Sequence, residues 1–197
     1  MKRKHRTRKK SGFKGLFLFL IAAGIVIGFL SFFRQELSRF VSPWLERRGL
    51  HGEKREVTLY FSDREAEYLV GERRKIGKRE DVEDEAGELI QELIRGPSRP
   101  LLQTLPSRTK LLSLQVDLEG TAKVDFNRSL SRDHPGGSLA EMMTVYSVVN
   151  SLTLNFPEIK RVQFLVEGQP IETLTGHLSL TQLVVPKPDL IRQAEKK

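Results

Sequence analysis

The residues best suited to chemistry lie between positions 129 and 134. Ser129, Ser131, Asp133 and His134 are the residue types of a hydrolytic triad, in which a histidine activates a hydroxyl and a carboxylate orients the histidine. A triad is defined by geometry, however, and polar loops often contain the same residue types. The sequence also lacks the G-x-S-x-G turn that presents a nucleophilic serine in many hydrolases. We therefore expect a polar loop at 129–137 and no catalytic residue.

Metal and cofactor chemistry has no recognisable motif either. The histidines His5, His51, His134 and His177 are scattered, without the spacing of a metal site. The chain has no cysteine, which excludes thiolate ligands, disulfides and a lipid-attachment cysteine. An acidic cluster at 81–88 matches the charge preference of a helix start. We predict no metal, no cofactor and no enzyme; the alternative is an envelope enzyme acting on cell-wall glycan, which would need two placed carboxylates.

The elements that must position any site follow an apolar run at residues 15–33. These nineteen residues carry no charged side chain, and as a helix they would span roughly 28 Å, close to the hydrocarbon thickness of a bilayer. We predict a single transmembrane helix at 15–33, preceded by a basic cytoplasmic tail at 1–14 and followed by a juxtamembrane linker at 34–55. A cleaved signal peptide is the alternative, although the run is longer than usual and ends without a small-residue cleavage site.

Charge predicts the orientation of this segment. Eight basic residues and no acidic residue precede the run, whereas four basic residues lie between Arg34 and Arg48. The whole chain has 33 basic and 25 acidic residues, so the part after the tail is formally neutral. Because Lys and Arg beside a spanning helix favour the cytoplasmic side, we predict the N-terminus inside and the domain outside. Basic arms also bind nucleic acid, but a topology signal explains the tail more simply, so we predict no nucleic-acid partner.

A pair of glycines lies within the apolar run. Gly24 and Gly28 form a G-x-x-x-G pattern, and glycines one turn apart allow spanning helices to approach closely. Glycine is also common in such helices in general. The pair is therefore either a transmembrane dimer contact, which would make the protein a homo-oligomer, or incidental.

Residues 56–186 are enough for one domain with its own core. Asp81 is the expected N-cap of a helix that ends at Gly96. The pattern Ser138-x-x-Glu141 predicts a capping box that opens a second helix, which runs to about residue 155. Alternation of apolar and polar residues predicts strands at 57–62, 68–70, 112–118, 122–126 and 162–166.

These patterns predict one small α+β domain, with two helices packed on a mostly antiparallel sheet and a polar tail at 187–197. The order of the pieces resembles the GerMN domain, the sporulation and spore germination family, over residues 57–185. The matching segments are Leu59-Tyr60-Phe61, Leu93-Ile94-Arg95-Gly96-Pro97, Pro106 through Thr109, Ala122-Lys123-Val124-Asp125-Phe126, Leu152 through Pro157, Val166-Glu167-Gly168 and Leu174-Thr175-Gly176-His177.

The resemblance implies a non-catalytic module on the outer face of a bacterial cytoplasmic membrane, in sporulation, germination or envelope assembly. The chain departs from family members of spore formers, which often carry two such domains and a lipoprotein cysteine. We predict a membrane-anchored binding or assembly module whose partner is a protein or cell-wall glycan. Because loops carry function more often than packed faces, the predicted contact surface is the loop 129–137 with the polar face of the sheet. The candidate partner contacts are Lys123, Arg128, Arg132, Asp133 and His134.

Overall fold

Residues 53–192 are the part of the chain that the computed structural model describes. Strands and helices alternate along it, as the sequence predicts. In chain order they are β1 (Lys54–Ser62), β2 (Leu69–Gly77), α2 (Val82–Arg95), β3 (Leu111–Val116), β4 (Thr121–Phe126), α3 (Ser129–Arg132), α4 (Ser138–Thr153), β5 (Arg161–Val166), β6 (Gln169–Pro170) and the 3-10 helix η1 (Pro188–Leu190).

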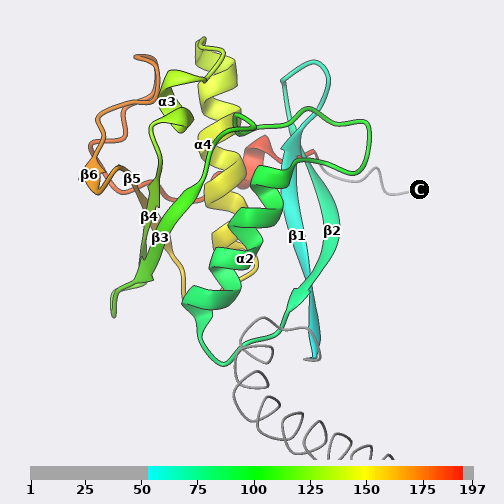
Figure 1. Ribbon diagram of the computed structural model, residues 1–197. Helices are drawn as coiled ribbons and strands as arrows, with labels where there is room; N and C mark the ends of the chain where they lie inside the picture. The colour runs from blue at the N-terminus through cyan, green and yellow to red at the C-terminus, as the bar shows by residue number, and fades with distance from the viewer. Residues whose placement is uncertain (1–52, 193–197) are drawn as a thin grey trace, which may run out of the picture. The chain divides into compact units, whose positions relative to one another are not determined.

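Helices α2 and α4 lie between a hairpin and a four-stranded sheet (Figure 1). The hairpin consists of β1 and β2, and the sheet has the order β3-β4-β5-β6. All pairings are antiparallel except that of β4 with β5, which run parallel because α4 provides the crossover between them. The α+β class and the mostly antiparallel pairing are confirmed. The prediction of one sheet is wrong, because the helices separate two sheets.

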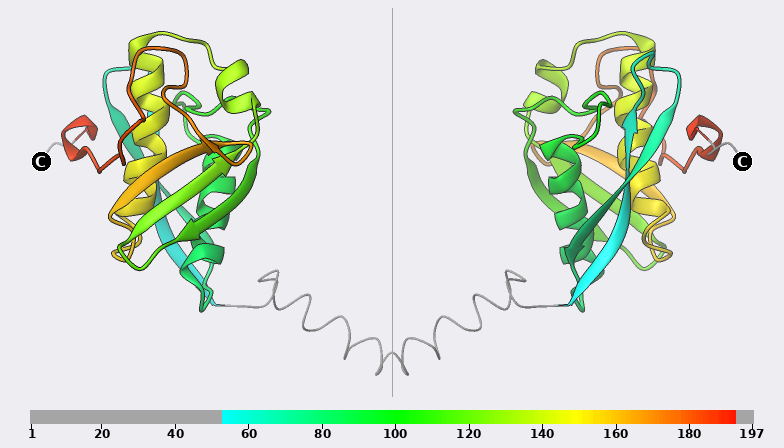
Figure 2. Two further views of the ribbon diagram at one scale, coloured as in Figure 1. Left: turned by 90° about the vertical axis from the view of Figure 1, so that its left-hand side faces the viewer. Right: turned by 90° about the vertical axis from the view of Figure 1, so that its right-hand side faces the viewer.

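The core lies between these layers. Phe126 of β4 and Phe164 of β5 are buried side by side, with ring centroids 6.4 Å apart. The intervening residues of these strands point to the opposite face, where Gln115 and Lys123 are exposed. Figure 2 shows this outer face of the sheet in front of the helices. The polar sheet face expected from the alternation therefore exists.

Helix α2 begins and ends where the sequence predicts. Asp81 accepts a hydrogen bond from the Glu83 amide at 2.8 Å, and Gly96 follows the last turn with φ of 91°. The acidic residues of the first turn also bind other elements: Glu83 accepts from the Val116 amide at 2.7 Å, and buried Glu85 pairs with Arg55 at 2.7 Å. The acidic cluster is therefore a set of structural contacts.

Strand β2 is much longer than the predicted segment at 68–70. Glu72 is buried on this strand and pairs at 2.6 Å with the half-buried Arg74, so the added length carries charged residues on its inner face. Part of the predicted polar tail also packs on the domain, because Ile191 forms a β-bridge with Leu69 and Arg192 pairs with Asp63 at 2.5 Å. Because the Glu72–Arg74 pair interrupts the apolar alternation of β2, the sequence pattern did not reveal the full length of this strand.

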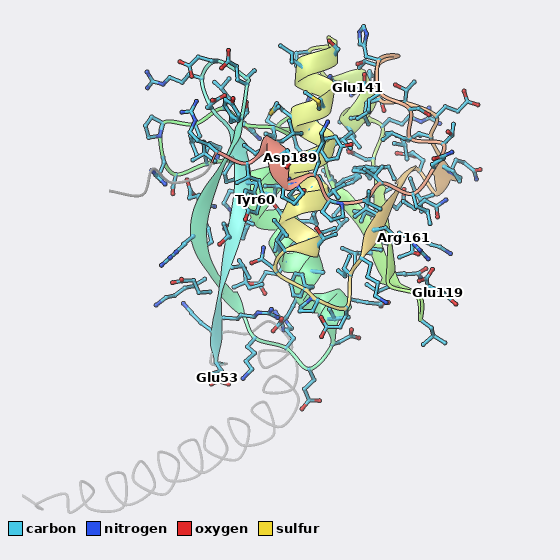
Figure 3. The ribbon with its side chains drawn as sticks, turned by 180° about the vertical axis from the view of Figure 1, so that it is seen from behind. Glu53, Tyr60, Glu119, Glu141, Arg161 and Asp189 are labelled. Carbon is cyan, nitrogen blue, oxygen red and sulfur yellow. The ribbon has the colours of Figure 1, made fainter. Side chains whose placement is uncertain are left out.

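The predicted capping box at Ser138 is wrong. Gly137, with φ of 88°, precedes the helix, and no side chain caps it. Glu141 is fully buried and faces the segment 173–177 instead (Figure 3). Its carboxylate accepts from the amides of Leu174 at 2.7 Å and His177 at 3.0 Å, among other donors of that segment. The glutamate fits the local pattern but binds a distant part of the chain.

Helix α4 also covers the edge of β1 that faces away from β2. Ser151 Oγ accepts from the Tyr60 amide at 3.0 Å, and Ser147 Oγ donates to the Tyr60 carbonyl at 2.6 Å. Just beyond the helix, Asn155 accepts from the Thr58 amide at 2.8 Å and donates to the Thr58 carbonyl at 2.7 Å. Ser147, Ser151 and Asn155 form a polar stripe with one residue in every four. This stripe provides hydrogen-bond partners for the backbone groups on the outer edge of β1.

The predicted basic tail at 1–14, transmembrane helix at 15–33 and most of the linker lie outside the described residues. Between residues 53 and 192, no helix combines the length and the apolar character needed to cross a bilayer. Strand β1 begins at Lys54, so the last residues of the predicted linker belong to the domain.

Candidate functional site

A cleft of about 340 Å³ opens beside the N-terminal half of α4. Its walls come from the turn after β1, the segment 102–107, the first turns of α4 and Pro135 of the loop before that helix. The lining is largely apolar, with Ala66, Leu102, Leu105 and Met143 among its members. The cleft therefore lies next to the loop that the sequence singles out.

Buried hydroxyl groups fix the floor of this cleft. Thr144 Oγ1 donates to the Thr104 carbonyl at 2.5 Å. The hydroxyls of Thr104 and Ser147 are 2.7 Å apart, and Ser147 donates onward to the Tyr60 carbonyl. The Thr104 hydroxyl must then be the donor to Ser147, because each hydroxyl has one proton. This relay connects the floor of the cleft to α4 and β1.

The loop 129–137 begins with a helical turn, α3, where the sequence predicts only loop. Asp133 follows it and pairs with Arg132 at 3.0 Å and Arg108 at 3.1 Å. The hydrogen bond from Arg132 is the main reason why the pKa of Asp133 lies below its usual value. Both arginines are largely exposed, at 65% and 73% of their side chains. This end of the molecule thus presents two guanidinium groups around one carboxylate.

The residues of the suspected triad do not form a relay. His134 is 9% exposed, and its ring contacts the Thr144 hydroxyl at 2.9 Å and the Gly136 amide at 3.0 Å. Ser129 instead accepts a bond from Arg132, whose guanidinium also binds Asp133. Since the histidine faces neither serine nor the aspartate, the arrangement of this loop is structural.

The structure brings together only part of the predicted contact set. Arg128 is exposed just before α3, and its amide donates to Glu167 at 3.2 Å. Arg132 and Asp133 lie beside it, whereas His134 is mostly inside. Lys123 is exposed on the middle of β4, next to a separate depression lined by Glu83, Gln115, Val116 and Asp117. Gly24 and Gly28 lie outside the described residues.

Sequence reasoning missed the cleft altogether. Leu102, Ala140 and Met143 line it but read as ordinary core or loop residues, so no local signal marks them. Within residues 53–192, no group of histidines, cysteines or acidic residues is arranged to hold a metal.

Two buried carboxylates organise the loops around the helices. Burial alone would raise the pKa of Glu141, but hydrogen bonds from Thr173, Thr175 and His177 outweigh it and lower the pKa to about 2. Burial likewise opposes ionisation of Glu72, and bonds from Ser98 and Arg74 still hold its pKa below the usual value. Both groups are therefore ionised anchors for loop backbone.

The fold is that of a small α+β domain with two sheets. The chain belongs to the Germane family, described as sporulation and spore germination, whose model matches residues 58–172. No curated protein matches the chain significantly.

Solved structures share the fold. A protein of Clostridium perfringens that is described as a lipoprotein is 25% identical with a TM-score of 0.50, over 71% of this chain and 93% of that one. The first GerMN domain of the sporulation protein GerM from Bacillus subtilis is 20% identical with a TM-score of 0.53, over 68% and 99% of the two chains. The tandem GerMN domains of GerM give the same identity and TM-score, over 70% of this chain and 48% of that chain.

Proposed function

We propose that this protein is a non-catalytic binding module of the sporulation and germination type, held at the outer face of the bacterial cytoplasmic membrane. One observation carries the anchor: nineteen uncharged residues directly follow a tail with eight basic and no acidic residues. The similar Clostridium protein is described as a lipoprotein. Because the present chain has no cysteine for a lipid, the apolar run would replace that kind of attachment.

The proposed binding role depends on how the polar groups of the loop 129–137 are hydrogen-bonded and exposed. His134 and Asp133 both use their hydrogen bonds to hold the loop, and the Thr144 hydroxyl that His134 contacts already donates its proton to the Thr104 carbonyl. The exposed Arg128 and Arg132 belong to the same loop region as Pro135, which lines the apolar cleft. Such a surface offers charged groups for orientation and apolar area for affinity, which suits recognition of a protein partner.

A topology reporter tests the anchor. A reporter that is active only outside the cytoplasm, fused after Lys197, should be active in the intact chain. Replacing the eight basic tail residues by neutral ones should reduce this activity, because the charge difference across the run then favours the opposite orientation. Activity of a cytoplasm-only reporter at the same position, or a mature N-terminus near residue 33, would contradict the proposal.

Charge reversal tests the contact surface. The change Arg128→Glu should leave the fold intact, because the side chain is exposed, and should abolish crosslinking of the full chain to its partner in native membranes. The control is Arg73→Glu, on β2 with 79% of its side chain exposed, which should crosslink as the wild type does. Equal loss in both variants, or no loss in either, would remove the loop end from the proposed contact surface.

A further inference from the structure

The hydrogen bonds around His134 define its protonation state. The Gly136 amide donates to Nδ1 at 3.0 Å, so this nitrogen must carry a lone pair. Nε2 lies 2.9 Å from Thr144 Oγ1, whose own proton is used on the Thr104 carbonyl. Nε2 is then the donor, and the ring is the neutral tautomer with its proton on Nε2.

A second proton would disrupt this arrangement. Protonated Nδ1 becomes a donor and would face the Gly136 amide, which is also a donor. The two donors then face each other, and losing this hydrogen bond in a partly buried site is costly. Since the ring is held on its other side by Thr144, the backbone at Gly136 is the part that must move.

The loop is built to allow such a movement. Gly136 and Gly137 have φ of 81° and 88°, and a Cβ placed on either would meet nothing within 4 Å. Both residues therefore have open space around them and the backbone freedom of glycine. Gly137 precedes α4 without a side-chain cap, so releasing the loop does not break a cap. Pro135, next to this pair, forms one wall of the cleft.

We propose that His134 is a pH-sensitive latch, whose protonation releases residues 135–137 and moves one wall of the cleft. The latch requires neither the anchor nor the partner proposed above, so it can fail or hold independently of them. The latch opens because protonation converts Nδ1 of His134 from a hydrogen-bond acceptor into a donor that faces the Gly136 amide.

The charges around the ring set the direction of the response. Burial lowers the pKa of His134 below 6.5, while the Glu141 carboxylate on α4 and the Ala140 carbonyl favour the charged form. The other charges packed nearby are Asp133 and Arg132 at α3 and Arg108 on the adjacent segment, which neutralise one another in part. A lowered pKa means that the closed loop is favoured above the ordinary histidine pKa and weakens as the pH falls below it.

Hydrogen exchange of the full chain in detergent micelles tests the latch. Exchange of the peptide covering 135–138, corrected for the intrinsic pH dependence, should rise by up to about tenfold when the pH falls to about one unit below the ordinary histidine value. The change His134→Gln, which keeps a donor and an acceptor but does not titrate, should remove this rise. His177→Gln, which changes an exposed histidine, should retain it.

Each outcome decides the proposal. An equal rise in wild type and His134→Gln would overturn it, as would a wild-type peptide with no pH response. If His134→Gln fails to fold, nitrogen chemical shifts of labelled wild-type histidine decide instead. They should show one neutral ring with its proton on Nε2 well above the histidine pKa, and a proton on Nδ1 in that ring would refute the latch.

Discussion

The change Glu141→Gln is expected to lower the free energy of unfolding by about 3 kcal/mol at neutral pH. A carboxyl whose pKa falls from 4.5 to about 2 on folding contributes on this order when ionised. Glutamine has nearly the same shape, but its amide nitrogen is a donor and cannot accept from the segment 173–177. It therefore leaves some of the donors at Thr173, Leu174, Thr175 and His177 without an acceptor.

The same reasoning predicts a pH dependence with a definite sign. The folded-state pKa of Glu141 is depressed, so its contribution is fully present above about pH 4.5 and is lost as the pH falls toward about 2. Urea unfolding followed by circular dichroism should show wild type losing stability faster than Glu141→Gln over this range. Glu172→Gln, an exposed neighbour of the same segment, serves as the control and should resemble wild type. A Glu141→Gln variant as stable as this control would show that the carboxylate is not an anchor.

Asn155→Ala is expected to cost about 2–4 kcal/mol, because truncation removes two hydrogen bonds to β1 and one to the last turns of α4. The side chain accepts from the Thr58 amide and donates to the carbonyls of Thr58 and Ser151 at 2.7 Å each. Exchange of the Thr58 amide should accelerate more than that of amides in β2. The loss should be larger than for Ser151→Ala, which removes one bond to β1.

The matched control for this prediction is Thr153→Ala in the last turn of α4. Its hydroxyl donates only to the Val149 carbonyl of its own helix, at 2.8 Å, so little stability should be lost. If both variants lose the same amount, helix-end propensity explains the effect and the contact with β1 contributes nothing measurable.

Local signals accounted for much of the fold. The cap at Asp81 and the stop at Gly96 depend on neighbours in the chain, and both ends of α2 were predicted for that reason. Alternation predicted β4 and β5, because apolar side chains lie on one face of their sheet and polar side chains such as Lys123 and Gln163 on the other. The division into two sheets depends on which strands pair across long stretches of sequence, and no local pattern encodes it.

The errors arose where tertiary contacts replaced local ones. Ser138 and Glu141 fit a capping pattern, but the glutamate gains more acceptor bonds from residues far along the chain than from its own helix start. Within β2, Glu72 and Arg74 neutralise each other inside, which hides the strand from an argument based on apolar residues. For the candidate site, the loop at 129–137 was located correctly. The cleft beside it is formed by four separate segments, and no sequence motif in any of them indicates a cleft.

The stripe formed by Ser147, Ser151 and Asn155 has a consequence for behaviour at high concentration. An unpaired strand edge is a template on which a neighbouring chain can add a strand, and such addition begins aggregation. Through the stripe, α4 occupies the edge of β1 where a strand from a neighbouring chain would otherwise pair. On the other side of the hairpin, the exposed Arg73 and Lys75 of β2 place charge where another strand would dock. One edge of the hairpin is therefore covered by α4 and the other carries charge, and both features disfavour strand addition between copies of the chain.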